Sequence, residues 1–157
     1  TLQLDFAAGK AFDMSYIYAN GEKKTPFVIH RSSIGCYERT LAMLIEKYAG
    51  AFPLWISPLQ VKILSVTDRS IDYAKSLADK LTYAGIRVEC DFRSEKIGRK
   101  IRDAQLEKIP YMLVLGDREV ENGSTVSVRE RNGENYEMST DEFIAKIVFE
   151  DKNKVIK

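Results

Sequence analysis

The stretch VKILSVTDRSIDYAKSLADKLTYAGIRVECDF, residues 61–92, decides the fold. It begins with a short apolar run over 61–66, which is typical of a buried strand. Between 71 and 83, apolar residues recur on one helical face, and Gly85 follows at the position of a helix cap. The run over 86–92 predicts a second strand. Strand, helix and strand in this order predict a parallel pair of strands with the helix packed on one face.

The remainder of the chain continues the alternation of strands and helices. A helix is predicted over 97–109, where apolar residues occupy one side and basic residues the rest. Strands are predicted over 111–116 and 124–131, and Asn132-Gly133 predicts a turn after them. The segment Ser139–Glu142 is a capping box, and it predicts the start of a last helix.

The first part of the chain predicts apolar strands followed by a helix. Asn20-Gly21 is a strong hairpin signal between the second and third strands, because both turn positions tolerate a positive φ. Apolar residues from Leu41 to Tyr48 fall on one face of the predicted helix. The predicted elements are strands over 2–6, 12–18 and 26–30 and a helix over 37–48.

Pro53 and Pro58 mark the connection between two predicted domains, because proline biases the preceding residue toward an extended backbone. We predict a fragment of an antiparallel sheet over 1–57 and an α/β domain with a mixed sheet flanked by helices over 58–157. A strand that begins at residue 2 suggests a piece of a longer protein. Such a fragment has an open sheet edge, so we expect self-association. The apolar side chains expected to be partly exposed are Phe6, Phe12, Tyr16 and Phe27.

Composition places the chain among soluble globular proteins. It has 157 residues, 45% hydrophobic and 30% charged, with a net charge of +1. Its two cysteines, Cys36 and Cys90, lie outside any CxxC pair, which indicates free thiols in a reducing cytoplasm. No signal peptide or membrane-spanning run is present, so we expect no membrane partner.

The segment IHRSSIGCYER, residues 29–39, places ionisable groups at a joint between a strand and a helix. The chain's single histidine, His30, is on composition alone better interpreted as structural, since zinc needs several converging ligands. Arg39 lies in the first helical turn, where the helix dipole favours anions, so the arginine gains nothing from the dipole. This mismatch indicates another role, and a guanidinium suits phosphate binding or stacking on adenine. A solvated Glu38–Arg39 pair is an equally supported alternative.

Basic residues dominate the predicted helix at 97–109 and the loop before it. Six cations stand against three carboxylates there, an excess that is compatible with a phosphate-facing patch, although on the residues alone a solvated helix face is favoured. The cations are Arg93, Lys96, Arg99, Lys100, Arg102 and Lys108, and the carboxylates are Glu95, Asp103 and Glu107.

Longer motifs resemble a known family. The stretch IHRSSIGCYERTLAMLIEKYAGAFPLWISPLQV resembles the third signature motif of class II aminoacyl-tRNA synthetases, in the form found in threonyl-tRNA synthetases. The stretch SEKIGRKIRDAQLEKIPYMLVLGDREVENGSTVSVRER is similar to the anticodon-binding domain of the same family. The resemblance implies that 1–57 ends a catalytic domain and that 58–157 is an anticodon-binding domain. It also implies a cytoplasmic, homodimeric ligase that joins threonine to tRNA with ATP.

For the first domain, the resemblance implies a set of substrate and metal roles. Arg39 matches the arginine that stacks on adenine and supports ATP, with Glu38 beside it. His30 matches one protein ligand of a zinc ion that holds threonine, and magnesium accompanies ATP. Gln3, Ser32 and Cys36 match positions around the threonine pocket, although Cys36 replaces a serine found in many relatives. Two zinc ligands and two signature motifs are absent, so we expect the isolated chain to lack aminoacylation activity.

For the second domain, the resemblance implies contacts with the anticodon loop of tRNA. Ser94 occupies a position where asparagine is expected, and Lys108 one where arginine is expected, which weakens base recognition there. The implied contact residues are Ser94, Lys96, Arg102, Lys108, Glu119 and Arg129.

Two other functions fit parts of the sequence. One alternative is a non-catalytic RNA-binding or accessory module that borrows the anticodon-binding fold, and the pair of His30 and Arg39 argues against it. A flavodoxin-like ligand-binding domain is a weaker alternative, because the loop TDRSIDY after the strand at 61–66 has no glycine to hold a phosphate.

Overall fold

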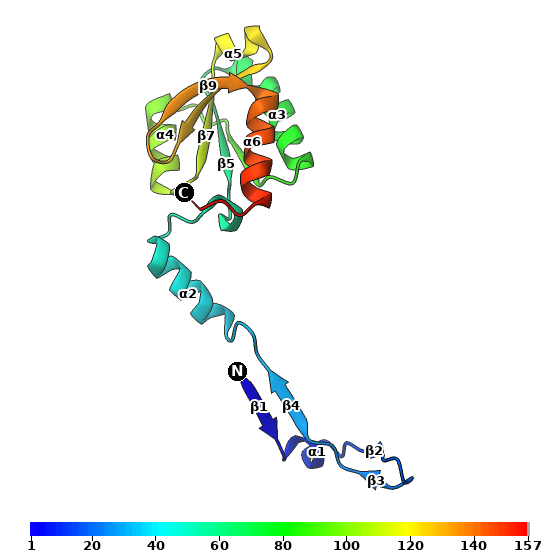
Figure 1. Cartoon of the computed structure of the whole chain (residues 1–157). Helices are drawn as coiled ribbons and strands as arrows, with labels where there is room; N and C mark the ends of the chain where they lie inside the picture. Colours follow the sequence, from blue (N-terminus) through cyan, green and yellow to red (C-terminus); the bar gives the residue numbers. More distant parts are fainter. Residues whose placement is uncertain (157) are drawn as a thin grey trace. The chain divides into compact units, whose positions relative to one another are not determined.

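The computed structural model describes residues 1–156 and divides into two compact units, Thr1–Leu44 and Ile45–Lys157 (Figure 1). The division falls inside the helix α2 (Tyr37–Tyr48), whose bounds match the predicted helix. The domain boundary predicted at 57/58 stays a prediction. No helix among the described residues combines the length and apolar character needed to cross a membrane.

The second unit is built on a five-stranded mixed sheet of order β6-β5-β7-β8-β9. The strand β5 runs parallel to both its neighbours, β6 and β7, whereas β8 is antiparallel to β7 and β9 is antiparallel to β8. The predicted α/β class with a mixed sheet is therefore confirmed. The strands are β5 (Val61–Ser65), β6 (Val88–Asp91), β7 (Tyr111–Leu115), β8 (Thr125–Glu130) and β9 (Asn135–Ser139).

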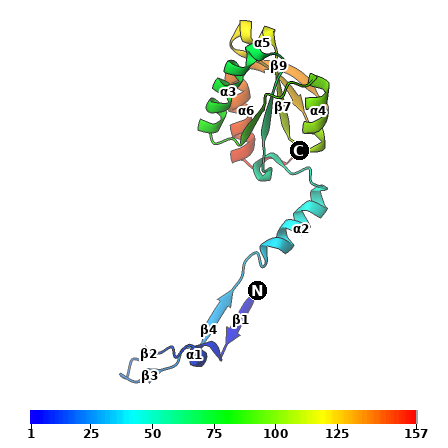
Figure 2. The ribbon, with the colours of Figure 1, turned by 180° about the vertical axis from the view of Figure 1, so that it is seen from behind.

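Helices cover both faces of this sheet. The helices α3 (Ile71–Tyr83) and α6 (Thr140–Lys152) lie on one face, and α4 (Ile97–Leu106) lies on the other (Figures 1 and 2). Leu77 of α3 and Phe143 of α6 belong to the larger buried cluster, whereas α4 closes a smaller one. The short elements are η1 (Leu54–Ile56), η2 (Asp68–Ser70) and α5 (Asp117–Asn122).

The capping box predicted at the start of the last helix is confirmed. The Ser139 hydroxyl accepts a hydrogen bond from Glu142 N at 3.2 Å, and the Glu142 carboxylate accepts one from Ser139 N at 3.2 Å. The helix predicted to reach residue 109 ends at Leu106, because Lys108 adopts a positive φ of 58°. The sequence did not predict α5 or β9, which are short and carry few apolar residues.

The first unit contains two antiparallel strand pairs. The strand β1 (Leu2–Asp5) pairs with β4 (Val28–Arg31), and β2 (Tyr16–Ile17) pairs with β3 (Lys23–Lys24). The turn predicted at Asn20-Gly21 is confirmed, with Gly21 at a φ of 83°. The predicted hairpin partner of the second strand was wrong. The turn joins β2 to β3, whereas the strand predicted over 26–30 pairs with β1.

The strand predicted over 12–18 is also shorter than expected, because the helical turn α1 (Ala8–Ala11) is followed by a turn in which Asp13 has a φ of 48°. The Asp5 carboxylate accepts hydrogen bonds from Ala7 N at 2.8 Å and Ala8 N at 2.9 Å, which begins this turn. Gly9 is required in α1, since a Cβ there would overlap the Pro26 carbonyl oxygen.

Large apolar side chains of the first unit are exposed, as predicted. Phe6 is 61% exposed and Phe27 is 67% exposed, and their rings meet edge to face at 5.1 Å. Phe12 is 77% exposed and Tyr16 is 44% exposed, and α2 buries no residue. Self-association through these side chains stays a prediction.

Candidate nucleic-acid interface

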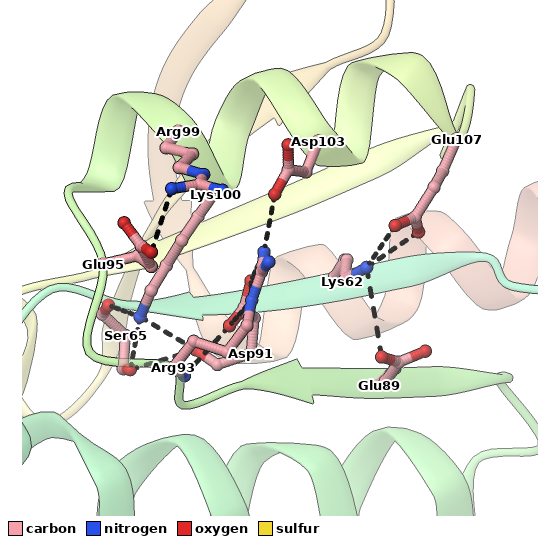
Figure 3. A network of polar contacts seen from close by, with 10 residues as sticks. All are labelled: Lys62, Ser65, Glu89, Asp91, Arg93, Glu95, Arg99, Lys100, Asp103 and Glu107. Carbon is pink, nitrogen blue, oxygen red and sulfur yellow. Dashed lines mark hydrogen bonds and ion pairs between the residues drawn. The ribbon is translucent and has the colours of Figure 1, made fainter.

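The helix α4 is positioned by an apolar stripe along one side. Ile97, Ile101 and Ala104 recur at helical spacing and pack toward Leu64 of β5 and Met112 of β7. This contact places α4 against the face of the sheet opposite α3 and α6. Polar contacts at both ends and in the middle of α4 then fix its orientation (Figure 3).

At the start of α4, Lys100 points inward to the carboxyl ends of two strands. It is 2% exposed, and its ammonium donates to Ser65 O at 2.8 Å and to Asp91 O at 3.2 Å (Figure 3). The Ser65 hydroxyl takes part in the same cluster at 3.3 Å. Lys100, which was counted in the predicted basic patch, therefore does not face solvent, since its ammonium is bound at the ends of β5 and β6.

In the middle of α4, Arg93 joins the helix to β6. Its guanidinium donates to both carboxylate oxygens of Asp91, from Nε at 3.0 Å and from a terminal nitrogen at 2.7 Å. The same terminal nitrogen lies 2.9 Å from Asp103 of α4 (Figure 3). Hydrogen bonds from Arg93 hold the pKa of Asp91 below its usual range, although burial opposes them, and they raise the pKa of Arg93.

At the end of α4, Lys62 of β5 holds Glu107. The Lys62 side chain is 6% exposed, and its ammonium lies 2.7 Å from the Glu107 carboxylate. Glu89, directly opposite Lys62 on β6, lies 3.9 Å from the same ammonium. This contact neutralises one of the three carboxylates counted in the basic patch.

The predicted basic patch is thus much smaller than the sequence suggested. Arg99 forms an exposed ion pair with Glu95 at 3.0 Å, so Arg99, like Arg93 and Lys100, already has a partner within the protein. Only Lys96 and Arg102, among the cations predicted for the patch, are exposed side chains with no hydrogen-bond or ion-pair partner within residues 1–156. They are the cations that α4 offers to a phosphate.

Lys108 lies apart from these two cations. Lys96 immediately precedes α4, whereas Lys108 follows its end, and a helix of 10 residues is about 15 Å long. The Lys108 ammonium donates to Ala49 O, and its carbonyl oxygen accepts from Arg131 at 3.1 Å. The structure therefore does not bring Lys108 into the same cluster.

The loop that begins α4 borders a crevice at the carboxyl ends of the parallel strands. The sheet has a switch point there, because the strands on both sides of β5 are parallel to it while α3 and α4 cover opposite faces. Ligands bind at such points in open α/β sheets. The polar residues that line this crevice include Ser65, Thr67, Ser94, Lys96 and Lys100.

Glu119 and Arg129 come from two further elements. One oxygen of Glu119 accepts a hydrogen bond from Gly116 N at 2.8 Å and so caps α5. Arg129 of β8 lies beside Met112 on β7, which places it on the face that α4 partly covers. Asn135 of β9 accepts a hydrogen bond from the Arg129 guanidinium at 3.2 Å.

The Asn135 amide is itself fixed. Its nitrogen donates to Gly133 O at 3.1 Å in the turn that precedes β9, so its oxygen faces Arg129. The Nε of Arg129 is buried and has no partner within residues 1–156. The guanidinium therefore keeps its position through Asn135, a residue that the sequence did not suggest.

In the first unit, Gln3 and His30 lie directly opposite each other on β1 and β4, so their side chains share a face. The His30 imidazole Nε2 lies 3.2 Å from the Asp5 carboxylate. Backbone hydrogen bonds from Ala8 and Ala7, and then the bond with His30, hold the pKa of Asp5 below its usual range. A carboxylate that orients an imidazole in this way is common beside metal ligands.

The described residues do not fit a zinc site on their own. No group of three or more histidine, cysteine, aspartate or glutamate side chains converges within residues 1–156, and a protein zinc site needs three or four ligands. The metal role of His30 stays a prediction that requires ligands from elsewhere.

Arg39 and its neighbours lie at the start of α2. The Cys36 thiol donates to the Glu38 carboxylate at 2.6 Å, which holds the pKa of Glu38 below its usual range. Arg39 is exposed and has no partner in the described chain, so the alternative of a Glu38–Arg39 pair is wrong. Ser32 meets Thr1 only through backbone hydrogen bonds. No described contact joins Arg39 to His30.

Comparisons with known proteins agree on the same part of the chain. Residues 60–150 match the family described as anticodon binding domain. A threonine–tRNA ligase of Clostridium perfringens strain 13 is 56% identical over 155 residues, which cover 98% of this chain and 24% of the relative. A threonine–tRNA ligase of Clostridium botulinum strain Eklund 17B is 61% identical over 134 residues, or 85% of this chain and 21% of the relative.

A solved structure is similar over nearly the whole chain. It is the RNA binding domain of threonyl-tRNA synthetase from Cryptosporidium parvum Iowa II, with a TM-score of 0.74 and 33% identity. The match covers 93% of this chain and 37% of that chain. The present chain thus spans about a quarter or less of the ligases it matches.

Proposed function

Because this chain belongs to the anticodon binding domain family and its relatives are threonine–tRNA ligases, we propose that its second unit binds the anticodon loop of a tRNA. The resemblance to threonyl-tRNA synthetases drawn from the sequence is confirmed. The family match concerns residues 60–150, so the activity of a whole ligase is part of the proposal.

The observation that carries this proposal is the state of the charges on α4. Lys96 and Arg102 are exposed and unpaired within the described chain, while neighbouring cations are committed to carboxylates or backbone carbonyls. Free cations on a rigid helix bind phosphates without first breaking an ion pair. The RNA backbone would therefore follow α4 from its start to its middle.

Base recognition requires groups that are held in place. Arg129 is held by Asn135 and offers its remaining guanidinium donors, which suit the acceptor edge of a guanine. Glu119 uses one carboxylate oxygen for its helix cap, and the other oxygen suits a base amino group. Ser94 in the loop before α4 supplies a hydroxyl that can donate or accept.

We also propose that the first unit contributes to the catalytic domain of a ligase. Arg39 would contact ATP, with Glu38 beside it, and Gln3, Ser32 and Cys36 would lie near threonine. The exposed and unpaired guanidinium of Arg39 supports a role with a ligand from outside the described residues. We expect the chain alone not to charge tRNA, because the described residues do not assemble a zinc site.

Binding of a labelled anticodon stem-loop to the full chain tests the proposed function. Fluorescence anisotropy should show tighter binding to a stem-loop with a threonine anticodon than to one with an unrelated anticodon. Equal affinity for the two RNAs would leave only non-specific binding and contradict anticodon recognition. A non-catalytic accessory module would bind RNA without this preference for a threonine anticodon.

A further inference from the structure

The ion pair between Arg93 and Asp103 lies next to a proposed RNA contact. Asp103 follows Arg102 on α4, and Arg93 precedes the helix in the loop from β6. We propose that Arg93 and Asp103 are positioning residues that fix α4 for RNA binding, and that they do not contact RNA themselves. This inference rests on the proposed function.

The anchor of this contact is a buried carboxylate. The Asp91 side chain is 3% exposed, while the Arg93 side chain is 50% exposed and the Asp103 side chain is 32% exposed. Asp91 lies directly opposite Leu64, a member of the apolar cluster under α4. The contact with both carboxylate oxygens of Asp91 fixes the plane of the Arg93 guanidinium. The hydrogen bond from this guanidinium to Asp103 then holds α4 at a fixed position relative to β6.

The apolar stripe alone does not fix how α4 is rotated, and the bonds of Lys100 and Glu107 act near its start and its end, so Asp103 is the anchoring contact nearest to Arg102. Hydrophobic contact is non-directional, whereas a charged hydrogen bond has a preferred distance and angle. Rotation of a helix by ~10° moves its surface by about 1 Å, since the helix radius with side chains is roughly 5–6 Å. Such a shift would misplace Arg102, the neighbour of Asp103, relative to a phosphate.

Simple electrostatics and the positioning role predict opposite results for one substitution. Asp103→Ala removes a negative charge near the RNA, so electrostatics alone predicts tighter binding. The positioning role predicts weaker binding, because α4 loses its contact with Arg93. Glu95→Ala is the matched control, since it removes a carboxylate paired with Arg99 at 3.0 Å and this exposed pair does not reach the sheet.

We expect Asp103→Ala to weaken binding of the full chain to the threonine anticodon stem-loop about fivefold, on the scale of one lost hydrogen bond. Glu95→Ala should leave affinity unchanged or tighten it. Asp103→Asn keeps an uncharged acceptor and should restore part of the affinity. Urea unfolding of each variant should show that the protein is folded under the binding conditions.

A double-mutant cycle separates positioning from general stability. In the Arg102→Ala background, Asp103→Ala should cost little further affinity, because the group that it positions is gone. Independent costs, or equal effects of Asp103→Ala and Glu95→Ala, would overturn the inference while leaving anticodon binding intact. Failure of the unsubstituted chain to prefer the threonine anticodon would overturn the proposed function, and the inference with it.

Discussion

Removing the two free cations of α4 should reduce the salt dependence of RNA binding by an amount that the structure sets. Each phosphate contact to a single-stranded RNA contributes about 0.7 to the slope of log affinity against log salt concentration. Lys96 and Arg102 together should contribute about 1.4, whereas all six cations of the predicted patch would contribute about 4.2.

The assay is anisotropy of a labelled threonine anticodon stem-loop, titrated with the full chain at several salt concentrations. Between about 50 and 200 mM salt, a slope of about 1.4 corresponds to a roughly sevenfold change in affinity. The double variant Lys96→Ala/Arg102→Ala should lose that share of the salt response. Lys80→Ala is the control, because Lys80 is an exposed lysine on α3, on the other face of the sheet.

One result would refute this reasoning. If the double variant keeps the slope of the unsubstituted chain, phosphates do not contact Lys96 or Arg102. A slope change that, per charge removed, equals that of Lys80→Ala would show only an effect of net charge. Either outcome would move the RNA-binding surface away from α4.

Three further substitutions and one assay test other parts of the structure. Asp91→Asn should lower the free energy of unfolding by about 2 kcal/mol through loss of charged hydrogen bonds, measured by urea unfolding. The folded-state pKa of Asp91 is lowered from 3.8, so the ionised carboxylate contributes to the free energy of unfolding above about pH 4, and this contribution is lost as pH falls through the folded-state pKa. The Asn variant should lack this acid dependence. Ser139→Ala should cost about 1 kcal/mol in thermal unfolding through loss of the α6 cap, and Ser139→Thr should retain most of it. Asn135→Ala should weaken stem-loop binding severalfold only while Arg129 is present, and equal effects in the Arg129→Ala background would contradict the contact. The isolated chain should self-associate in light scattering through residues 1–57 and show no aminoacylation, and a monomeric or active chain would contradict these expectations.

Local patterns in the sequence predicted most of the second unit. The helix over 71–83 and the start of α6 follow from apolar spacing and a capping box, which depend only on neighbours in the chain. The short elements α5 and β9 escaped this reasoning, since each carries few apolar residues and β9 is held by its pairing with β8.

The burial of Lys100 could have been found from the sequence. It shares helical spacing with Ile97, Ile101 and Ala104, so the stripe that faces the sheet includes its position. A long side chain at such a position buries its stem and carries its charge to a polar partner. Counting the charges of the segment without their faces therefore overestimated the basic patch.

The sequence by itself determined the α/β class, the main helices, and the relationship to threonyl-tRNA synthetases, because spacing, caps and motifs act over short stretches of chain. Only the tertiary structure decided which charges are free. Lys62 meets Glu107, and Lys100 meets Ser65, across elements that are distant in sequence. Whether a cation pairs internally or faces a ligand depends on distances of a few ångströms between separate elements, and those distances arise only when the sheet and α4 pack together.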